Sequence, residues 1–297
     1  MKKSNTSPTA VSSSLDSIMY IIIKIKTLLI GVAIFVVILT VMITSERTFT
    51  RADSASSRGM SAAATKEASS LHSSSSVPIS FPFGSGDDKK TLDFIHCGAS
   101  IKKGKMNEIT EIILLHGAKY TKKDWVTSGI FDDLCLRGEG KFSVTALDLS
   151  VTATGEALRD VFNALSKKKV ISGGPAIIVS PSASGKTIMD LIINAITEND
   201  VTLGDYLKIW IPVASPAVLS ANYDGKTFDF LKKQGIPILA INGNQDRMGK
   251  KVTEKLMELS GARGIEIEGS HAVYLDEPNE FVETVVQYVQ GIDNEER

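Results

Sequence analysis

Residues 175–196 read Pro-Ala-Ile-Ile-Val-Ser-Pro-Ser-Ala-Ser-Gly-Lys-Thr-Ile-Met-Asp-Leu-Ile-Ile-Asn-Ala-Ile, and this stretch decides the fold. Its first part is apolar and β-branched, which predicts a buried strand. Its last part is apolar almost throughout and predicts a helix packed against a sheet. Only small residues lie between them, so the chain must turn sharply, with Ser182 at the point of the turn. Such a turn needs small residues two places before and after its centre, where Ser180 and Ser184 stand. We therefore interpret Ser182 as a nucleophile.

The same residues allow two other interpretations. Residues 180–187 match the phosphate-binding pattern G-x-x-x-x-G-K-[ST] at every fixed position except the first, and Lys186 and Thr187 would then hold phosphate and magnesium. Alternatively, the loop only caps the following helix. The phosphate loop is disfavoured because four predicted strands precede this one. In addition, the next predicted strand, 207–213, does not end in an aspartate that could bind magnesium.

The composition restricts the class of protein. The chain has 297 residues, a hydrophobic content of 43% and a formal net charge of -1. It can bury a sizeable core, and its balanced charge gives no reason to expect a nucleic acid as partner. The two cysteines, Cys97 and Cys135, form neither a disulfide framework nor a zinc site. We expect two buried thiols, while a single disulfide in an oxidising compartment is the alternative.

The amino-terminal region divides into three parts. Residues 1–17 form a polar cytoplasmic tail, residues 18–45 a transmembrane signal anchor, and residues 46–76 a Ser- and Ala-rich stem that we expect to be disordered. The uncharged run 27–45 would span roughly 28 Å as a helix, close to the ~30 Å hydrocarbon core of a bilayer. The preceding lysines favour a type II membrane protein of the secretory pathway with a lumenal or extracellular body. A cleaved signal peptide is the alternative.

Residues 77–297 alternate between strand-like and helix-like patterns, which predicts one α/β domain. We expect a mostly parallel eight-stranded sheet with helices on both faces and a small cap within residues 215–235. Apolar residues at helical spacing predict helices at 157–165 and 278–289. The predicted strands are residues 77–81, 91–97, 111–115, 142–147, 176–180, 207–213, 236–241 and 264–267.

A serine becomes a nucleophile when a base takes its proton and an acid orients that base. Three of the four histidines are poorly placed to act as the base. His72 lies in the stem, His96 within a predicted strand, and His116 in the motif that follows the strand 111–115. The fourth, His271, follows the last predicted strand, and Asp246 follows the seventh. Taken alone, His271 is typical of a surface histidine and Asp246 of a turn. Together with Ser182 they stand in the order nucleophile, acid, base, each after a different strand, which predicts a catalytic triad.

The oxyanion that forms during acyl transfer needs hydrogen-bond donors already in place. The backbone N–H of Ala183, directly after the nucleophile, is one candidate. The predicted strand 111–115 ends in His116 and Gly117, and the N–H of Ala118 is the second candidate. We expect His116 and Gly117 to support this loop rather than to react.

Several motifs carry a resemblance to a known family. They are Leu-Leu-His-Gly (114–117), Ser-Pro-Ser-x-Ser-Gly (180–185), Ala-Asn-Tyr (221–223), Gly-Asn-Gln-Asp-Arg-Met-Gly (243–249) and Ser-His-x-x-Tyr-Leu-Asp-x-Pro (270–278). Over residues 91–292 the chain resembles the alpha/beta-hydrolase domain-containing protein 14 family, and the family's triad would fall on the same three residues. Its membrane-anchored branch has an amino-terminal span of this type. The loop 148–155 departs from the family pattern, because it lacks a proline and a glycine. We therefore expect one wall of the substrate pocket to differ in shape from that of the family.

The resemblance implies a serine hydrolase or acyl transferase that acts on small acyl esters or acyl-amides. A narrower alternative is removal of acetyl groups from protein lysines with coenzyme A as acceptor. No metal and no redox cofactor are implied. A non-catalytic α/β-hydrolase-fold protein that presents a pocket or surface to a partner is the alternative from another class.

Overall fold

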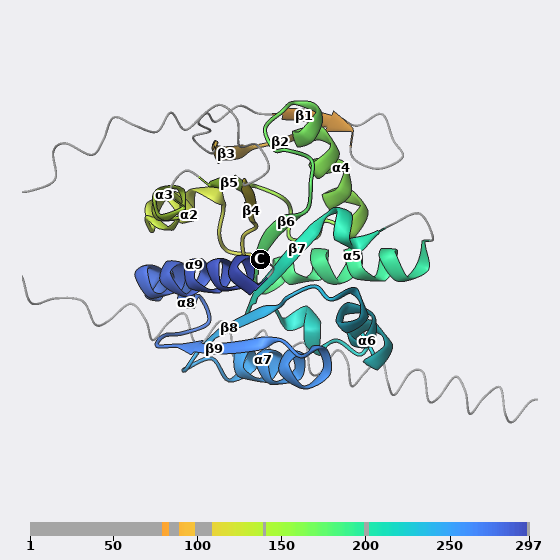
Figure 1. Cartoon of the computed structure of the whole chain (residues 1–297), viewed down its shortest axis with the longest axis vertical. Helices are drawn as coiled ribbons and strands as arrows, with labels where there is room; N and C mark the ends of the chain where they lie inside the picture. The colour runs from red at the N-terminus through yellow and green to blue at the C-terminus, as the bar shows by residue number, and fades with distance from the viewer. Residues whose placement is uncertain (1–78, 83–88, 99–108, 139–140, 199–201, 296–297) are drawn as a thin grey trace, which may run out of the picture. The chain divides into compact units, whose positions relative to one another are not determined.

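The computed structural model describes residues 79–82, 89–98, 109–138, 141–198 and 202–295 (Figure 1). The predicted tail, transmembrane anchor and stem lie outside the described residues. Within these ranges, no helix combines the length and the apolar character needed to cross a bilayer.

A seven-stranded sheet forms the centre of the described domain, in the order β3-β5-β4-β6-β7-β8-β9. Strand β3 runs antiparallel to β5, and the other neighbouring strands are parallel. The carboxyl ends of the parallel strands therefore meet at one edge. The strands are β3 (Phe94–Cys97), β4 (Thr110–Leu114), β5 (Phe142–Leu147), β6 (Ala176–Pro181), β7 (Leu207–Val213), β8 (Leu239–Gly243) and β9 (Arg263–Ile267).

The prediction of eight strands in one sheet is wrong for the described residues. The expected strand 91–97 is interrupted at Asp93, so that β2 (Lys89–Leu92) pairs with β1 (Ile79–Pro82) in a separate two-stranded sheet. The Asp93 carboxylate accepts a hydrogen bond from Lys122 Nζ at 2.9 Å, and its carbonyl accepts one from Asp148 N at 2.9 Å. These bonds fix Asp93 where the chain passes from one sheet to the other.

Helices cover both faces of the main sheet, as predicted (Figure 1). One face carries α4 (Gly155–Lys167), α5 (Gly185–Thr197), α6 (Gly225–Gln234) and α7 (Arg247–Ser260). The opposite face carries α2 (Lys122–Thr127), α3 (Ile130–Arg137), α8 (Val273–Asp276) and α9 (Pro278–Glu295). The predicted helices 157–165 and 278–289 correspond to α4 and α9. Residues 215–235, where we expect a small cap, form a 3-10 turn at Pro216–Leu219 and helix α6, whose apolar residues pack in the layer on this face of the sheet.

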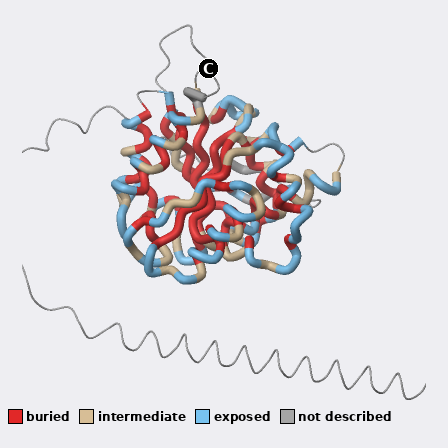
Figure 2. The backbone as a smooth tube through the Cα atoms, turned by 60° about the horizontal axis from the view of Figure 1, so that its bottom comes forward, coloured by how far each residue is buried: buried red, intermediate tan, exposed pale blue. Residues whose placement is uncertain are grey.

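Two apolar layers, one on each face, hold the helices to the sheet. Every residue of β4, β5 and β6 is buried, because both faces of these central strands are covered. Figure 2 shows the buried residues gathered at the centre of the domain. The core thus fixes the strand ends from which the candidate site is built.

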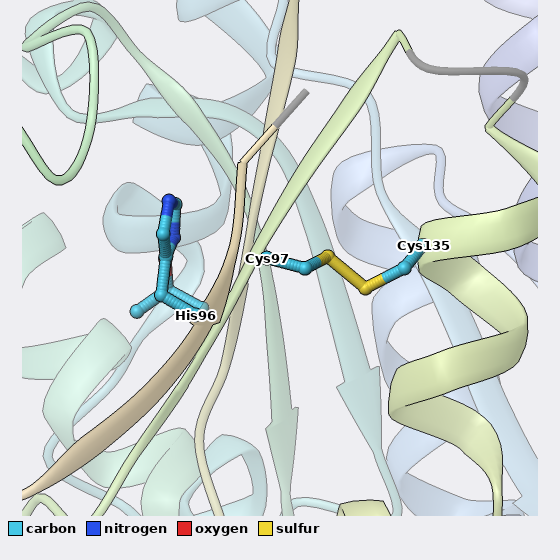
Figure 3. The surroundings of a disulfide bond; sticks show 4 residues. His96, Cys97 and Cys135 are labelled. Carbon is cyan, nitrogen blue, oxygen red and sulfur yellow. A yellow bond between two sulfur atoms is a disulfide. The ribbon is translucent and has the colours of Figure 1, made fainter. Parts of the chain in front are cut away.

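Cys97 and Cys135 form a disulfide, so the expectation of two buried thiols is wrong (Figure 3). Cys97 ends the edge strand β3, and Cys135 lies in α3, with a Cα–Cα distance of 6.5 Å that suits a disulfide. Both residues belong to the same buried apolar layer. The bond fastens the edge strand to a helix on one face, while His96 projects from the other side of the strand (Figure 3).

Candidate active site

Strand β6 passes directly into a 3-10 turn at Ser182–Ser184 and then into α5. Ser182 has a φ of 50°, in the left-handed region that residues with a Cβ rarely adopt. A strained serine between a strand and a helix is typical of a nucleophile elbow. The predicted sharp turn is confirmed, with Ser182 at its point.

The serines on either side of this turn are buried and hydrogen-bonded. Ser184 Oγ donates to the Pro181 carbonyl at 2.8 Å. Ser180 Oγ accepts from Trp210 Nε1 at 2.8 Å, and the Ser180 carbonyl accepts from Ser215 Oγ at 2.6 Å. The strained turn is therefore braced from β7 and from the segment that follows β7. Neither Trp210 nor Ser215 could be assigned this role from the sequence.

His271 joins the other two predicted triad residues. Its Nε2 lies 2.8 Å from Ser182 Oγ, and its Nδ1 lies 2.6 Å from Asp246 Oδ2. Because a carboxylate only accepts hydrogen bonds, Nδ1 carries the proton, and Nε2 is left to accept from the Ser182 hydroxyl. The predicted convergence of these three side chains is confirmed.

The Asp246 carboxylate is held by two partners. It caps α7 by accepting from Met248 N at 3.1 Å with Oδ1, while Oδ2 faces His271. Its side chain is only 8% exposed. A Cβ at Gly249 would lie 2.6 Å from Oδ2, so only glycine lets α7 approach this closely. Asp246 therefore bonds a nearby backbone N–H, as the interpretation as a turn residue expected, and it is also the partner of the imidazole.

The loop that carries His271 is fixed on both sides. Ser270 donates to Asp276 Oδ2 through its backbone N at 2.7 Å and through its hydroxyl at 2.6 Å. Gln245 N donates to the Gly269 carbonyl at 3.0 Å, which joins this loop to that of Asp246. Gly269 has a φ of 143°, which favours glycine. These bonds hold the imidazole at the sheet edge.

The loop after β4 packs against the strained turn. A Cβ at Gly117 would lie 3.6 Å from Ser182 Cβ and 3.3 Å from Tyr120 Cδ2, so glycine allows a close approach here. Tyr120 N donates to the Gly117 carbonyl at 3.0 Å and closes the turn that holds Ala118. Among the turn, loop and cap hydrogen bonds of the described residues, none uses the N–H of Ala118 or of Ala183. Ala183 directly follows Ser182, and Ala118 lies in the turn that Gly117 begins, so their role as oxyanion donors stays a prediction.

His116 supports this loop, as expected. Its Nδ1 donates to the Gly117 carbonyl at 3.0 Å, and its Nε2 lies 3.9 Å from Asp148 Oδ1. Asp148 also accepts from the backbone N of Lys122 at 2.6 Å and from its Nζ at 2.5 Å. Burial alone would lower the pKa of Lys122, but its bonds to Asp148 and Asp93 raise that pKa above its ordinary value. This buried lysine fastens the start of α2 to the end of β5.

Two solved structures share this arrangement of strands and helices. A hydrolase from Thermoplasma acidophilum, described as CIB-like, aligns with a TM-score of 0.52 and 19% identity over 73% of this chain and 99% of its own. A carboxylesterase from Nitrososphaera gargenis aligns with a TM-score of 0.52 and 12% identity over 74% of this chain and 100% of its own. The chain has the α/β-hydrolase fold.

Sequence similarity is more specific than the fold. The chain matches no family model. It is 27% identical over 198 residues to human ABHD14B, a candidate protein-lysine deacylase, and the alignment covers 61% of this chain and 83% of ABHD14B. This similarity confirms the resemblance to the α/β-hydrolase domain-containing protein 14 family. Membership of the membrane-anchored branch stays a prediction.

Lys186 and Thr187 both have structural partners in this fold. The Lys186 side chain pairs with Asp190 one helical turn later, and the Thr187 hydroxyl donates to the Ala153 carbonyl at 2.9 Å. Asp190 also accepts from the Tyr223 hydroxyl at 3.1 Å. Burial, together with Asp190, raises the pKa of Tyr223 to about 12. These contacts tie α5 to its neighbours and favour an ordinary helical role over phosphate binding.

Proposed function

We propose that this α/β-hydrolase is a serine hydrolase or acyl transferase that acts on small acyl esters or acyl-amides. The observation that carries the proposal is the pair of contacts made by His271, at 2.8 Å to Ser182 and at 2.6 Å to Asp246. A serine in this setting can lose its proton to the imidazole as it attacks, while the carboxylate keeps the imidazole in the reactive tautomer.

In the proposed reaction, Ser182 Oγ attacks the acyl carbon and its proton moves to His271 Nε2. The C=O electron pair moves onto oxygen, where the N–H groups of Ala118 and Ala183 would stabilise the negative charge. When the tetrahedral intermediate collapses, the bond to the leaving group breaks and Nε2 returns the proton to that group. The acyl group then remains on Ser182. Water, or another acceptor activated by the same imidazole, releases it. The scheme uses no metal and no redox cofactor.

The identity of the acceptor separates a hydrolase from a transferase. The name of ABHD14B refers to protein-lysine deacylation, which supports acyl-lysine as a narrower substrate class for this chain. Coenzyme A is then the candidate thiol acceptor. Product analysis with and without coenzyme A distinguishes the outcomes, because transfer gives acyl-coenzyme A whereas hydrolysis gives the free acid.

We further propose that the domain is held at a membrane by residues 18–45 and faces the lumen or the extracellular space. The Cys97–Cys135 disulfide supports this, because disulfides persist mainly in oxidising compartments. Protease protection in intact microsomes tests the orientation. Digestion of the catalytic domain without detergent would contradict it.

Labelling of the full-length chain with a fluorophosphonate tests the proposed activity. We expect Ser182→Ala to abolish labelling and to lower turnover of a short-chain ester by about 10⁴- to 10⁶-fold. Ser260→Ala is the matched control, because within the described residues Ser260 Oγ bonds only the Leu256 carbonyl, at 2.6 Å near the end of α7. Labelling that survives Ser182→Ala would overturn the proposal. A folded wild-type chain that never reacts but binds a partner would favour the non-catalytic alternative.

A further inference from the structure

Trp125, in α2, is attached to the start of the loop that holds Ala118. Its side chain is buried, and its Nε1 donates to the Leu115 carbonyl at 2.9 Å. Leu115 immediately precedes His116, so this bond fixes the point where the chain leaves β4. The loop of residues 115–120, named the oxyanion loop below, is thus anchored by an indole.

The same indole contacts the loop that carries the imidazole. Trp125 stacks on Tyr274, with ring centroids 4.6 Å apart and an interplanar angle of 30°. Tyr274 lies in α8, which begins two residues after His271. Residues 269–274 are named the base loop below. At the other end of the oxyanion loop, Tyr120 meets the Tyr274 ring edge-on at 6.1 Å and 77°.

Tyr274 acts in this contact through its ring. The side chain is buried, and within the described residues its hydroxyl has no hydrogen-bond partner. Burial raises the pKa of Tyr274, and the neighbouring Tyr120 and Asp124 add to the rise, so the hydroxyl stays neutral. Removing the Tyr274 hydroxyl therefore breaks no hydrogen bond among the described residues, whereas removing the Tyr274 ring abolishes its stacking on Trp125.

We propose that Trp125 is a positioning residue that sets the separation of the oxyanion loop and the base loop. It holds one loop through the Leu115 carbonyl and the other through the Tyr274 ring. A transition state at Ser182 must reach Nε2 of His271 and the N–H of Ala118 together, and these groups come from different loops. A displacement of about 1 Å at such a site costs up to about 100-fold in rate. The kinetic consequence rests on the proposed function, whereas the mechanical coupling of the loops does not.

Kinetics of the full-length chain test the positioning role. Trp125→Phe keeps an aromatic ring but loses the N–H that reaches Leu115. We expect kcat per fluorophosphonate-titrated site to fall about 10- to 100-fold with KM little changed. Tyr274→Leu should do the same, and Tyr274→Phe should retain the wild-type kcat. Phe281→Leu is the control, because Phe281 packs on Trp125 at 6.1 Å and on Tyr274 at 6.0 Å but lies in neither loop. It should lower stability without changing kcat per site.

Hydrogen exchange tests the coupling without any need for activity. Two amides report on the loops: Tyr120 N, bonded to the Gly117 carbonyl, and Ser270 N, bonded to Asp276. We expect Tyr274→Leu to speed exchange at Tyr120, and Trp125→Phe to speed it at Ser270. Exchange that does not rise at Tyr120 in Tyr274→Leu and at Ser270 in Trp125→Phe, or a kcat per site equal to wild type in Trp125→Phe, would overturn the inference. A wild-type chain that does not label would overturn the proposed function alone, since exchange still decides the coupling.

Discussion

Replacing Asp246 with asparagine should separate the two tasks of this carboxylate. Oδ1 caps α7 through Met248 N at 3.1 Å, and Oδ2 accepts from His271 Nδ1 at 2.6 Å. Asparagine has the same shape but only one acceptor oxygen, and its other group donates. If the oxygen keeps the cap, the NH₂ group faces Nδ1, and the imidazole proton must move to Nε2. The imidazole can then no longer accept the proton of Ser182.

The expected effects of Asp246→Asn on kcat and on stability differ greatly in size. A base held in the wrong tautomer costs about 10⁴-fold in kcat, which corresponds to about 5 kcal/mol of transition-state stabilisation. The free energy of unfolding should change little, because asparagine caps a helix about as well as aspartate. Asp246→Ala should lose the same activity and, in addition, about 1 kcal/mol of stability from the missing cap.

Ester hydrolysis and urea unfolding of the full-length chain measure the two effects on the same samples. Asp229→Asn is a suitable control, since Asp229 is an exposed residue of α6, and both quantities should match wild type. An Asp246→Asn variant with kcat within about tenfold of wild type would refute the tautomer argument, since the predicted loss is about 10⁴-fold.

Three further predictions concern stability. Trp210→Phe leaves the buried Ser180 hydroxyl without its donor, and urea unfolding should show a loss of about 1–3 kcal/mol; an unchanged midpoint would contradict this. Burial lowers the pKa of His96 in the folded chain below its ordinary value of 6.5. The unfolded chain therefore binds more protons than the folded chain as the pH falls below 6.5, and the free energy of unfolding decreases. In His96→Gln, Tm should fall less on acidification, and an equal fall would count against this assignment. Replacing Cys97 and Cys135 together with alanine opens a loop with a sequence separation of 38 and should cost about 4 kcal/mol; full stability in non-reducing buffer would contradict this.

The strained turn and the convergence of Ser182, Asp246 and His271 could be predicted because each residue carries a local signal. The apolar run before Ser182, the small residues around it and the apolar helix after it occupy one continuous stretch. Asp246 and His271 each follow a strand, and parallel strands bring their carboxyl ends to one edge. The order of the three residues along the chain then sufficed to place them together.

Two predictions were wrong because the features concerned depend on contacts between residues far apart in the sequence. Residues 91–97 look like one strand, and only the bonds of Asp93 to Lys122 and Asp148 divide it. Cysteine spacing could not show that the edge strand and α3 lie side by side, so the pairing of Cys97 and Cys135 was missed.

The brace of the strained turn is nonlocal in the same way. Trp210 and Ser215 lie 30 and 35 residues from Ser180, and no local pattern marks them. The support that Asp276 gives to the loop of His271 could have been predicted, because both residues stand in the motif 270–278.

Peptide mass spectrometry of the fluorophosphonate adduct shows which serine reacts. We predict one adduct on the full-length chain, on Ser182 and on neither neighbouring serine, and a large loss of that adduct in His271→Ala. An adduct on another serine, or equal labelling of Ser182 without the imidazole, would contradict it.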